Sequence, residues 1–92
     1  MRVTVEYAAQ IKRAAGVASE SVTIEAPYTL RELISRITAE HGESLANLLL
    51  GDDGGLSPSI LLFVGDTQVR EGMTTELHEN DVVTVLSPIS GG

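Results

Sequence analysis

The side chains that could do chemistry in this chain are few. Its 92 residues include no cysteine and only two histidines, His41 and His78. Without a thiol there is no disulfide framework, no thiolate zinc site, no iron–sulfur ligation and no cysteine nucleophile. Two histidines also leave too few ligands for a multi-histidine metal site within one chain. We expect His41 at the end of a helix, partly buried, and His78 in a solvated polar loop.

The serines and carboxylates do not combine into a recognisable catalytic motif. Ser87 is not part of the Gly-x-Ser-x-Gly elbow that presents a nucleophilic serine. The glycine-rich loop 51–55 lacks the lysine and following Ser/Thr of a phosphate-binding loop, and its Asp52 and Asp53 would repel an anion. These aspartates and Asp66 do not have EF-hand spacing. We therefore expect no metal and no bound cofactor.

The remaining candidate is the C-terminal carboxylate, which belongs to Gly92 and is preceded by Gly91. Two glycines make an arm without side chains, which can pass through a narrow channel and adopt any backbone conformation. The terminal residue has no Cβ to hinder attack at its carboxylate. Glycine pairs are also common at inert chain ends, so the meaning of this pair depends on the scaffold that holds it.

The hydrophobic pattern of the scaffold predicts a mixture of strands and helix. Alternating or continuous apolar residues predict strands over Arg2–Tyr7, Ser21–Ala26, Ile60–Val64, around Gln68–Val69 and over Asp81–Leu86. Short helical segments are expected over 8–15, ending at Gly16, and within 44–50. The segment 71–80 is expected to be irregular.

The clearest predicted element is a helix that begins after Thr29. Thr29 and Glu32 have the spacing of a capping box, in which each side chain satisfies a free backbone N–H. Leu30, Leu33, Ile34, Ile37 and His41 lie on one stripe at helical spacing. Gly42 is expected to end the helix.

This order of elements predicts an α+β domain of the β-grasp, or ubiquitin-like, class. A right-handed crossover places the main helix on one face of a mixed four- to five-stranded sheet. We predict a domain over 1–86 and a flexible tail over 87–92. Val83 and Val85 should face the helix, which leaves Leu86 on the other face. There Leu86 and Phe63 form an exposed apolar partner site, unless both faces of the sheet are covered.

The charge balance argues against some partners and for others. Thirteen acidic against six basic side chains give a net charge of −7. Binding to nucleic acids or anionic membranes needs Lys and Arg, so neither is expected. A basic partner surface is the better match. With no apolar run of about 18 residues and a strand-like N-terminus in place of a signal peptide, the chain is predicted to be cytoplasmic.

Nearly the full length of the chain resembles the MoaD/ThiS family of ubiquitin-like sulfur carriers. The likeness is sharpest from Ile60 to Gly92, where 75–83 resembles the family's T-x-L-x-x-G-D-x-V stretch and 87–92 its P-P-x-x-G-G ending. Asn80 stands in place of the usual glycine and Ser87 in place of the first proline. The helix opening Thr-Leu-Arg-Glu-Leu also resembles the family pattern. These departures keep the diglycine but do not point to one subfamily.

The resemblance implies a mechanism in which the protein is a carrier and a substrate, not an enzyme. An E1-like activating enzyme of the MoeB/ThiF type would use ATP and Mg²⁺ to adenylate Gly92, and sulfur would then displace AMP to leave a thiocarboxylate. Gly91 would help to thread the tail into the partner. The carrier would donate this sulfur within a partner enzyme, which it contacts through Phe63, Leu86, Pro88 and Ile89.

Within the family, we predict the small subunit of molybdopterin synthase, whose partner would be the large subunit of that enzyme. Chain length and the long segment between the helix and the third strand favour this subunit over ThiS, which is typically shorter. A CysO- or ThiS-like carrier for cysteine or thiamine synthesis remains open. So do a ubiquitin-like modifier conjugated to lysines and a plain interaction module with inert glycines.

Overall fold

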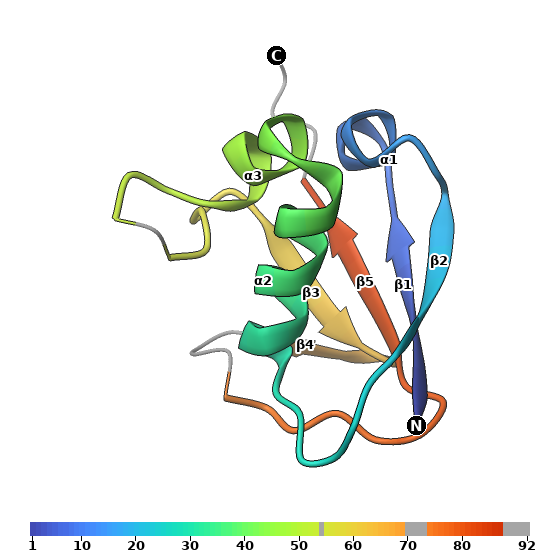
Figure 1. Cartoon of the computed structure of the whole chain (residues 1–92). Coiled ribbons are helices and arrows are strands. Elements are labelled where there is room, and N and C mark those ends of the chain that lie inside the picture. Colours follow the sequence, from blue (N-terminus) through green and yellow to red (C-terminus); the bar gives the residue numbers. More distant parts are fainter. Residues whose placement is uncertain (54, 70–73, 88–92) are drawn as a thin grey trace.

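The structure is a computed structural model, and it describes residues 1–53, 55–69 and 74–87 of the chain (Figure 1). In chain order its elements are β1 (Arg2–Tyr7), α1 (Gln10–Ala15), β2 (Ser19–Thr23), α2 (Leu30–His41), α3 (Glu43–Leu49), β3 (Leu61–Val64), β4 (Thr67–Val69) and β5 (Val82–Leu86). The predicted α+β class is confirmed.

The strands form one mixed five-stranded sheet in the order β2-β1-β5-β3-β4. The first and last strands lie side by side in parallel, with Val5 opposite Val83 and Tyr7 opposite Val85. The other neighbouring strands are antiparallel. Helix α2 crosses the sheet on one face, and α1 and α3 lie at the end of the sheet where β5 finishes (Figure 1). This is the β-grasp, or ubiquitin-like, architecture.

Helix α2 begins where the capping box predicts. Thr29 Oγ1 accepts a hydrogen bond from the Glu32 N–H at 3.2 Å, and the Glu32 carboxylate accepts one from the Thr29 N–H at 2.9 Å. Two N–H groups without helical partners are thereby satisfied. The helix ends at Gly42, whose φ of 86° is unfavourable for residues with a Cβ.

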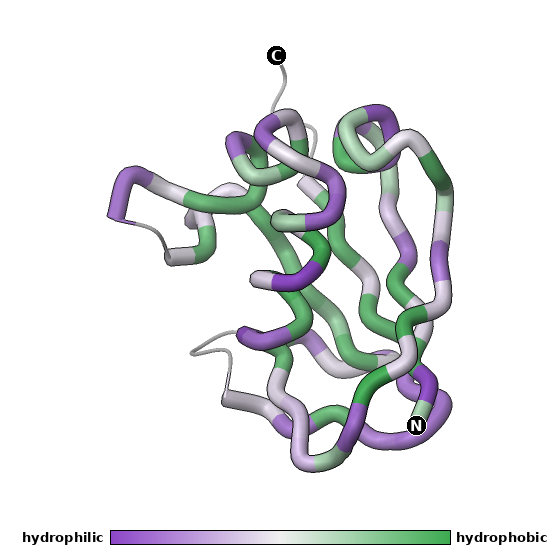
Figure 2. Tube along the Cα trace, viewed as in Figure 1, coloured by the Kyte–Doolittle hydropathy of each residue, from purple (hydrophilic) through white to green (hydrophobic). Residues whose placement is uncertain are grey.

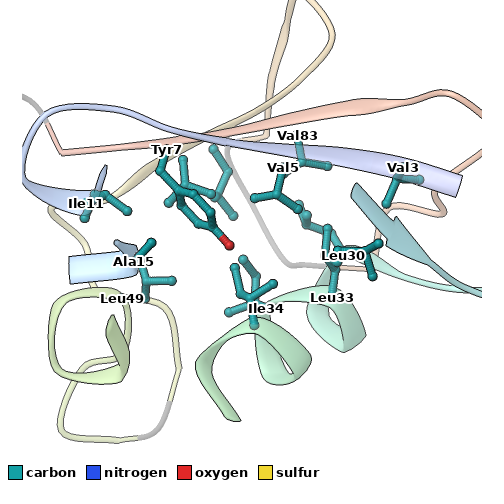
Figure 3. Close-up of a cluster of buried hydrophobic side chains, with 14 of the residues drawn as sticks. Val3, Val5, Tyr7, Ile11, Ala15, Leu30, Leu33, Ile34, Leu49 and Val83 are labelled. Carbon is teal, nitrogen blue, oxygen red and sulfur yellow. The ribbon is translucent and has the colours of Figure 1, made fainter. Parts of the chain in front are cut away.

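The core lies between α2 and the inner face of the sheet. Val3 and Val5 of β1, Val83 of β5, and Leu33 and Ile34 of α2 are all essentially inaccessible to solvent and point toward one another (Figure 3). Figure 2 shows apolar residues alternating along β1, dominating β5 and following one side of α2. Since burying such a side chain stabilises the fold by about 1.5–3 kcal/mol, this layer holds the helix onto the sheet.

One local prediction differs from the structure, and one buried residue was not predicted. The second strand spans Ser19–Thr23 rather than 21–26, because the chain turns away after Ile24, whose N–H bonds the Met1 carbonyl at 2.8 Å. In the irregular segment, Leu77 is buried, and its N–H bonds the Tyr28 carbonyl at 2.8 Å. An isolated buried leucine among polar residues has no periodic neighbours, so pattern analysis misses it.

Candidate functional site

Strand β5 provides a rigid base for the segment that follows it. Its neighbours are β1 on one side and β3 on the other. Beyond the ends of these two strands, the Ala8 N–H donates to the Val85 carbonyl at 3.1 Å and the Gly65 N–H to the Val82 carbonyl at 2.8 Å. Because the strand is hydrogen-bonded on both edges, it cannot shift without breaking two ladders. Whatever follows Ser87 therefore starts from a fixed point and a fixed direction.

The side chains of β5 alternate between the two faces of the sheet, as predicted. Val83 and Val85 are fully buried under the helices, whereas Val82, Thr84 and Leu86 are half-buried on the opposite face. No helix or strand packs against that opposite face within the part of the chain that the structure describes. The last residue before Ser87 thus presents an apolar side chain on the uncovered face.

Strand β3 adds two further apolar side chains to this face. Leu61 is paired with Leu86 and Phe63 with Thr84 across the antiparallel register, and Leu61 and Phe63 are half-buried. Their neighbour Leu62 points the other way and is only 1% exposed. We name Leu61, Phe63, Val82 and Leu86 the open-face patch. It lies directly beside the start of the C-terminal segment.

On the β1 side, the open-face patch is bordered by one carboxylate, that of Glu6, with Arg2 at the other end of the same strand face. Glu6 is exposed, and its register partner on β5 is Thr84, which lies between Phe63 and Glu6 in the sheet. On the outer strand β2 this face continues with small polar residues such as Ser21. An apolar centre with a carboxylate at its rim fits an apolar partner surface bordered by basic residues.

A polar cluster that the sequence did not reveal connects β1, β2 and α2. The Tyr7 hydroxyl donates to Glu20 Oε2 at 2.5 Å, and His41 Nε2 lies 2.5 Å from the same oxygen. The Tyr7 and His41 rings meet edge to face, with centroids 5.8 Å apart. Burial raises the pKa of Tyr7, and the hydrogen bond to the Glu20 carboxylate raises it further.

The same contacts determine the protonation state of Glu20. Burial acts to raise the pKa of Glu20, but hydrogen bonds with Tyr7 and His41 outweigh this effect, so the pKa lies below its usual value. The Glu20 carboxylate is therefore held charged. It accepts hydrogen bonds from Tyr7 on β1 and from His41 at the end of α2. His41 has an internal partner, which agrees with a partly buried structural residue. The sequence offered one signal for this cluster, because Tyr7 lies at a core-facing position of its strand and a buried tyrosine hydroxyl needs a hydrogen-bond acceptor.

The other predicted chemical residues lie apart. His78 is 77% exposed in its side chain, as expected of a solvated loop. Asp53 Oδ1 accepts from the Gly55 N–H at 2.9 Å, an interaction within the loop itself. Across residues 1–53, 55–69 and 74–87, no three potential metal ligands gather. Over the same ranges, no helix has the length and apolar character that crossing a bilayer requires.

Two of the predicted site residues, Phe63 and Leu86, thus lie together on the uncovered face. The others, Pro88, Ile89, Gly91 and Gly92, lie outside the described residues. What the geometry defines is a ubiquitin-like domain with an apolar patch beside the start of its C-terminal segment. It offers no enclosed reaction centre among the described side chains, and its recognition chemistry is that of a surface.

Comparison with known proteins identifies the family. Residues 5–92 match the model of the ThiS family, so the chain belongs to that family. A protein of Archaeoglobus fulgidus named "putative sulfur carrier protein" is 36% identical over 66 residues, which cover 70% of this chain and 74% of that protein. The chain is thus a member of a family of sulfur carriers and ubiquitin-like small modifiers.

Solved structures share the fold over nearly the whole chain. One is a Pyrococcus furiosus protein named "putative molybdopterin converting factor, subunit 1". It is 27% identical to this chain with a TM-score of 0.78, and the match covers 97% of this chain and 99% of that one. The small archaeal modifier protein 1 of Methanosarcina acetivorans is 25% identical with a TM-score of 0.81 and covers 99% and 96%. A chain in the complex of subunits 1 and 2 of the Helicobacter pylori molybdopterin-converting factor matches at 23% identity and a TM-score of 0.64, over 100% of both chains.

Proposed function

We propose that this protein is a sulfur carrier whose Gly92 carboxylate is adenylated by an E1-like enzyme and converted to a thiocarboxylate. The finer assignment is the small subunit of molybdopterin synthase, which donates that sulfur in molybdenum cofactor biosynthesis. The observation that carries the proposal is the extent of the family match, which runs to residue 92 and so includes the diglycine.

The tail chemistry follows from the properties of a carboxylate. A carboxylate is a poor electrophile, and adenylation with ATP and Mg²⁺ turns one of its oxygens into part of a good leaving group. A sulfur nucleophile then adds to the Gly92 carbonyl carbon, and AMP departs with the electron pair of the broken C–O bond. Two glycines expose that carbon because neither carries a Cβ. The carrier supplies no acid or base, so the activating enzyme performs catalysis.

The open-face patch supports a docking role in this process. A partner that receives the tail must bind close to its origin, and Leu86 lies one residue before Ser87, at the end of the rigid strand β5. An apolar patch of this kind is typical of an interaction site. The Helicobacter pylori complex of subunits 1 and 2, in which one chain has this fold, supports a large subunit as the partner. Glu6 beside the patch favours a basic border on that partner.

A second candidate function is conjugation to lysine side chains of other proteins. The likeness to a small archaeal modifier protein supports it, because the same activated carboxylate reacts with an amine in place of sulfur. CysO- and ThiS-like carriers share the activated tail and differ in the enzyme that accepts the sulfur. The two chemistries differ in their products, since a carrier gains a terminal sulfur and a modifier forms isopeptide adducts.

The deciding experiment is intact mass analysis after incubation with an E1-like enzyme, ATP, Mg²⁺ and a sulfur donor. We expect the mass gain that corresponds to exchange of one oxygen for sulfur. A variant that lacks Gly92, and another with one alanine added after Gly92, should show no gain. Their melting temperatures should match that of the original protein, because the change lies beyond the described core. A thiocarboxylate on either variant would refute the proposed mechanism.

A further inference from the structure

The chain offers very few amines that an activated carboxylate could acylate. Its six basic side chains comprise five arginines and one lysine, Lys12. Arginine stays protonated in proteins and does not act as an acyl acceptor. The amines are therefore the Lys12 side chain and the α-amine of Met1.

The structure separates these two amines by their surroundings. The Met1 ammonium donates to the Ile24 carbonyl at 2.7 Å and is partly buried, at the end of β1 opposite α1 (Figure 1). Lys12 is exposed on α1, and its ammonium makes no hydrogen bond or ion pair among the described residues. Of the two, Lys12 is thus the amine that a large activated group can approach.

A hollow beside Lys12 has the shape and charge to receive such a group. Lys12 and Arg13 line it together with Val17, which is 41% exposed, and with small residues that include Gly16 and Ala18. Among the residues that the structure describes, no acidic side chain lines this hollow. Small lining residues leave room for a backbone that carries no side chains, and the two cations attract an anionic partner. The adenylated end of a second copy of this chain has both properties, because its two glycines carry no side chains and its acyl phosphate is anionic.

We propose that Lys12 is an acceptor site for the activated C-terminus of a second copy of this protein. The proposal rests on the proposed function, which supplies the Gly92 acyl adenylate. The neutral Lys12 amine adds to the Gly92 carbonyl carbon, and a C–N bond forms. The C–O bond to the phosphate breaks, AMP leaves with its electron pair, and the nitrogen loses a proton to solvent. The product is an isopeptide-linked dimer, and further rounds extend it without branching.

A second copy is the better donor than the same molecule. The five residues after Ser87 span at most about 18 Å, and the activating enzyme must enclose their end to adenylate it. Helix α1 lies beside the end of β5, where that segment begins (Figure 1). The activated end of the donor is therefore held inside the enzyme, whereas Lys12 of another molecule is free to approach it.

The test is to incubate the full chain with an E1-like enzyme, ATP and Mg²⁺ without a sulfur donor. We expect a covalent species whose mass is that of two chains less one water. Trypsin should release a branched peptide in which Lys12 carries residues 71–92, because Arg70 is the last cleavage site. Lys12→Arg should abolish the dimer but leave adenylation, measured by pyrophosphate exchange, unchanged.

Two matched variants in the Lys12→Arg background test the role of the hollow. Arg13→Lys places an amine on the same hollow and should restore the dimer, whereas Arg31→Lys places one on exposed α2 and should not. A dimer that survives Lys12→Arg, a linkage at Met1, a cyclised monomer, or normal adenylation with no dimer would each overturn the inference. Absence of adenylation would instead refute the proposed function on which the inference rests.

Discussion

Leu86 and Val85 are neighbours in sequence but face opposite sides of the sheet, so the same substitution should have opposite consequences at the two positions. Val85 is 0% exposed, and Val85→Glu would place a carboxylate in the core with no partner. An unpaired buried charge costs several kcal/mol, which is comparable to the 5–15 kcal/mol of a typical domain. We expect Val85→Glu to unfold the protein.

Leu86→Glu should instead leave the fold largely intact. Complete burial of a leucine stabilises by about 1.5–3 kcal/mol, and half-burial implies a loss of only about 1 kcal/mol. If Leu86 lies at the centre of a partner interface, its loss should weaken binding by about 2 kcal/mol or more, which is roughly 30-fold in Kd. Binding thus suffers more than stability.

The assay combines urea denaturation with calorimetric titration of the E1-like enzyme. Ser21→Glu is the matched control, because Ser21 lies on the same face and is exposed on β2, away from the open-face patch. It should change neither stability nor affinity appreciably. If Leu86→Glu unfolds the protein as Val85→Glu does, or if it binds the enzyme as tightly as the control, the docking role of the open-face patch is wrong.

Two further predictions concern the scaffold. Thr29→Ala removes the capping box of α2 and should destabilise the protein by about 1 kcal/mol in urea denaturation; an unchanged midpoint would contradict this role. The Tyr7–Glu20–His41 cluster should shape the pH dependence of stability. Because folding lowers the pKa of Glu20, its contribution is present above the usual value of 4.5 and is lost as the pH falls below it. Because folding raises the pKa of Tyr7, its contribution is present below 10.0 and is lost at higher pH. Unfolding free energies from pH 3 to 11 should show both losses, and Glu20→Gln should reduce the acid-side loss; equal acid slopes in the two proteins would refute this assignment.

Much of the scaffold was predictable because it rests on local signals. The Thr29–Glu32 spacing located the start of α2, and Gly65-Asp66 located the turn between β3 and β4. Because successive side chains of a strand point to opposite faces, Val83 and Val85 were predicted to face the helix, and both are buried. Each of these signals depends on residues a few positions apart, where backbone geometry alone determines which side chains share a face.

Other features were not predictable, because they depend on residues far apart in the chain. Leu77 is buried through its position beside Tyr28, and Glu20 acquires its partners from β1 and from the end of α2. No short-range sequence pattern predicts such contacts between distant residues. The exposed setting of Lys12 and the hydrogen bond of the Met1 ammonium likewise required the packed structure.

The sequence by itself determined the chemical repertoire of this protein. It excluded thiol chemistry, restricted the side-chain amines to Lys12, and supplied the Gly91-Gly92 pair. Only the tertiary structure decided how those groups are presented, because presentation depends on which strand pairs with which. Pairing of β5 with both β1 and β3 holds the base of the tail and brings Leu61 beside Leu86 on the uncovered face.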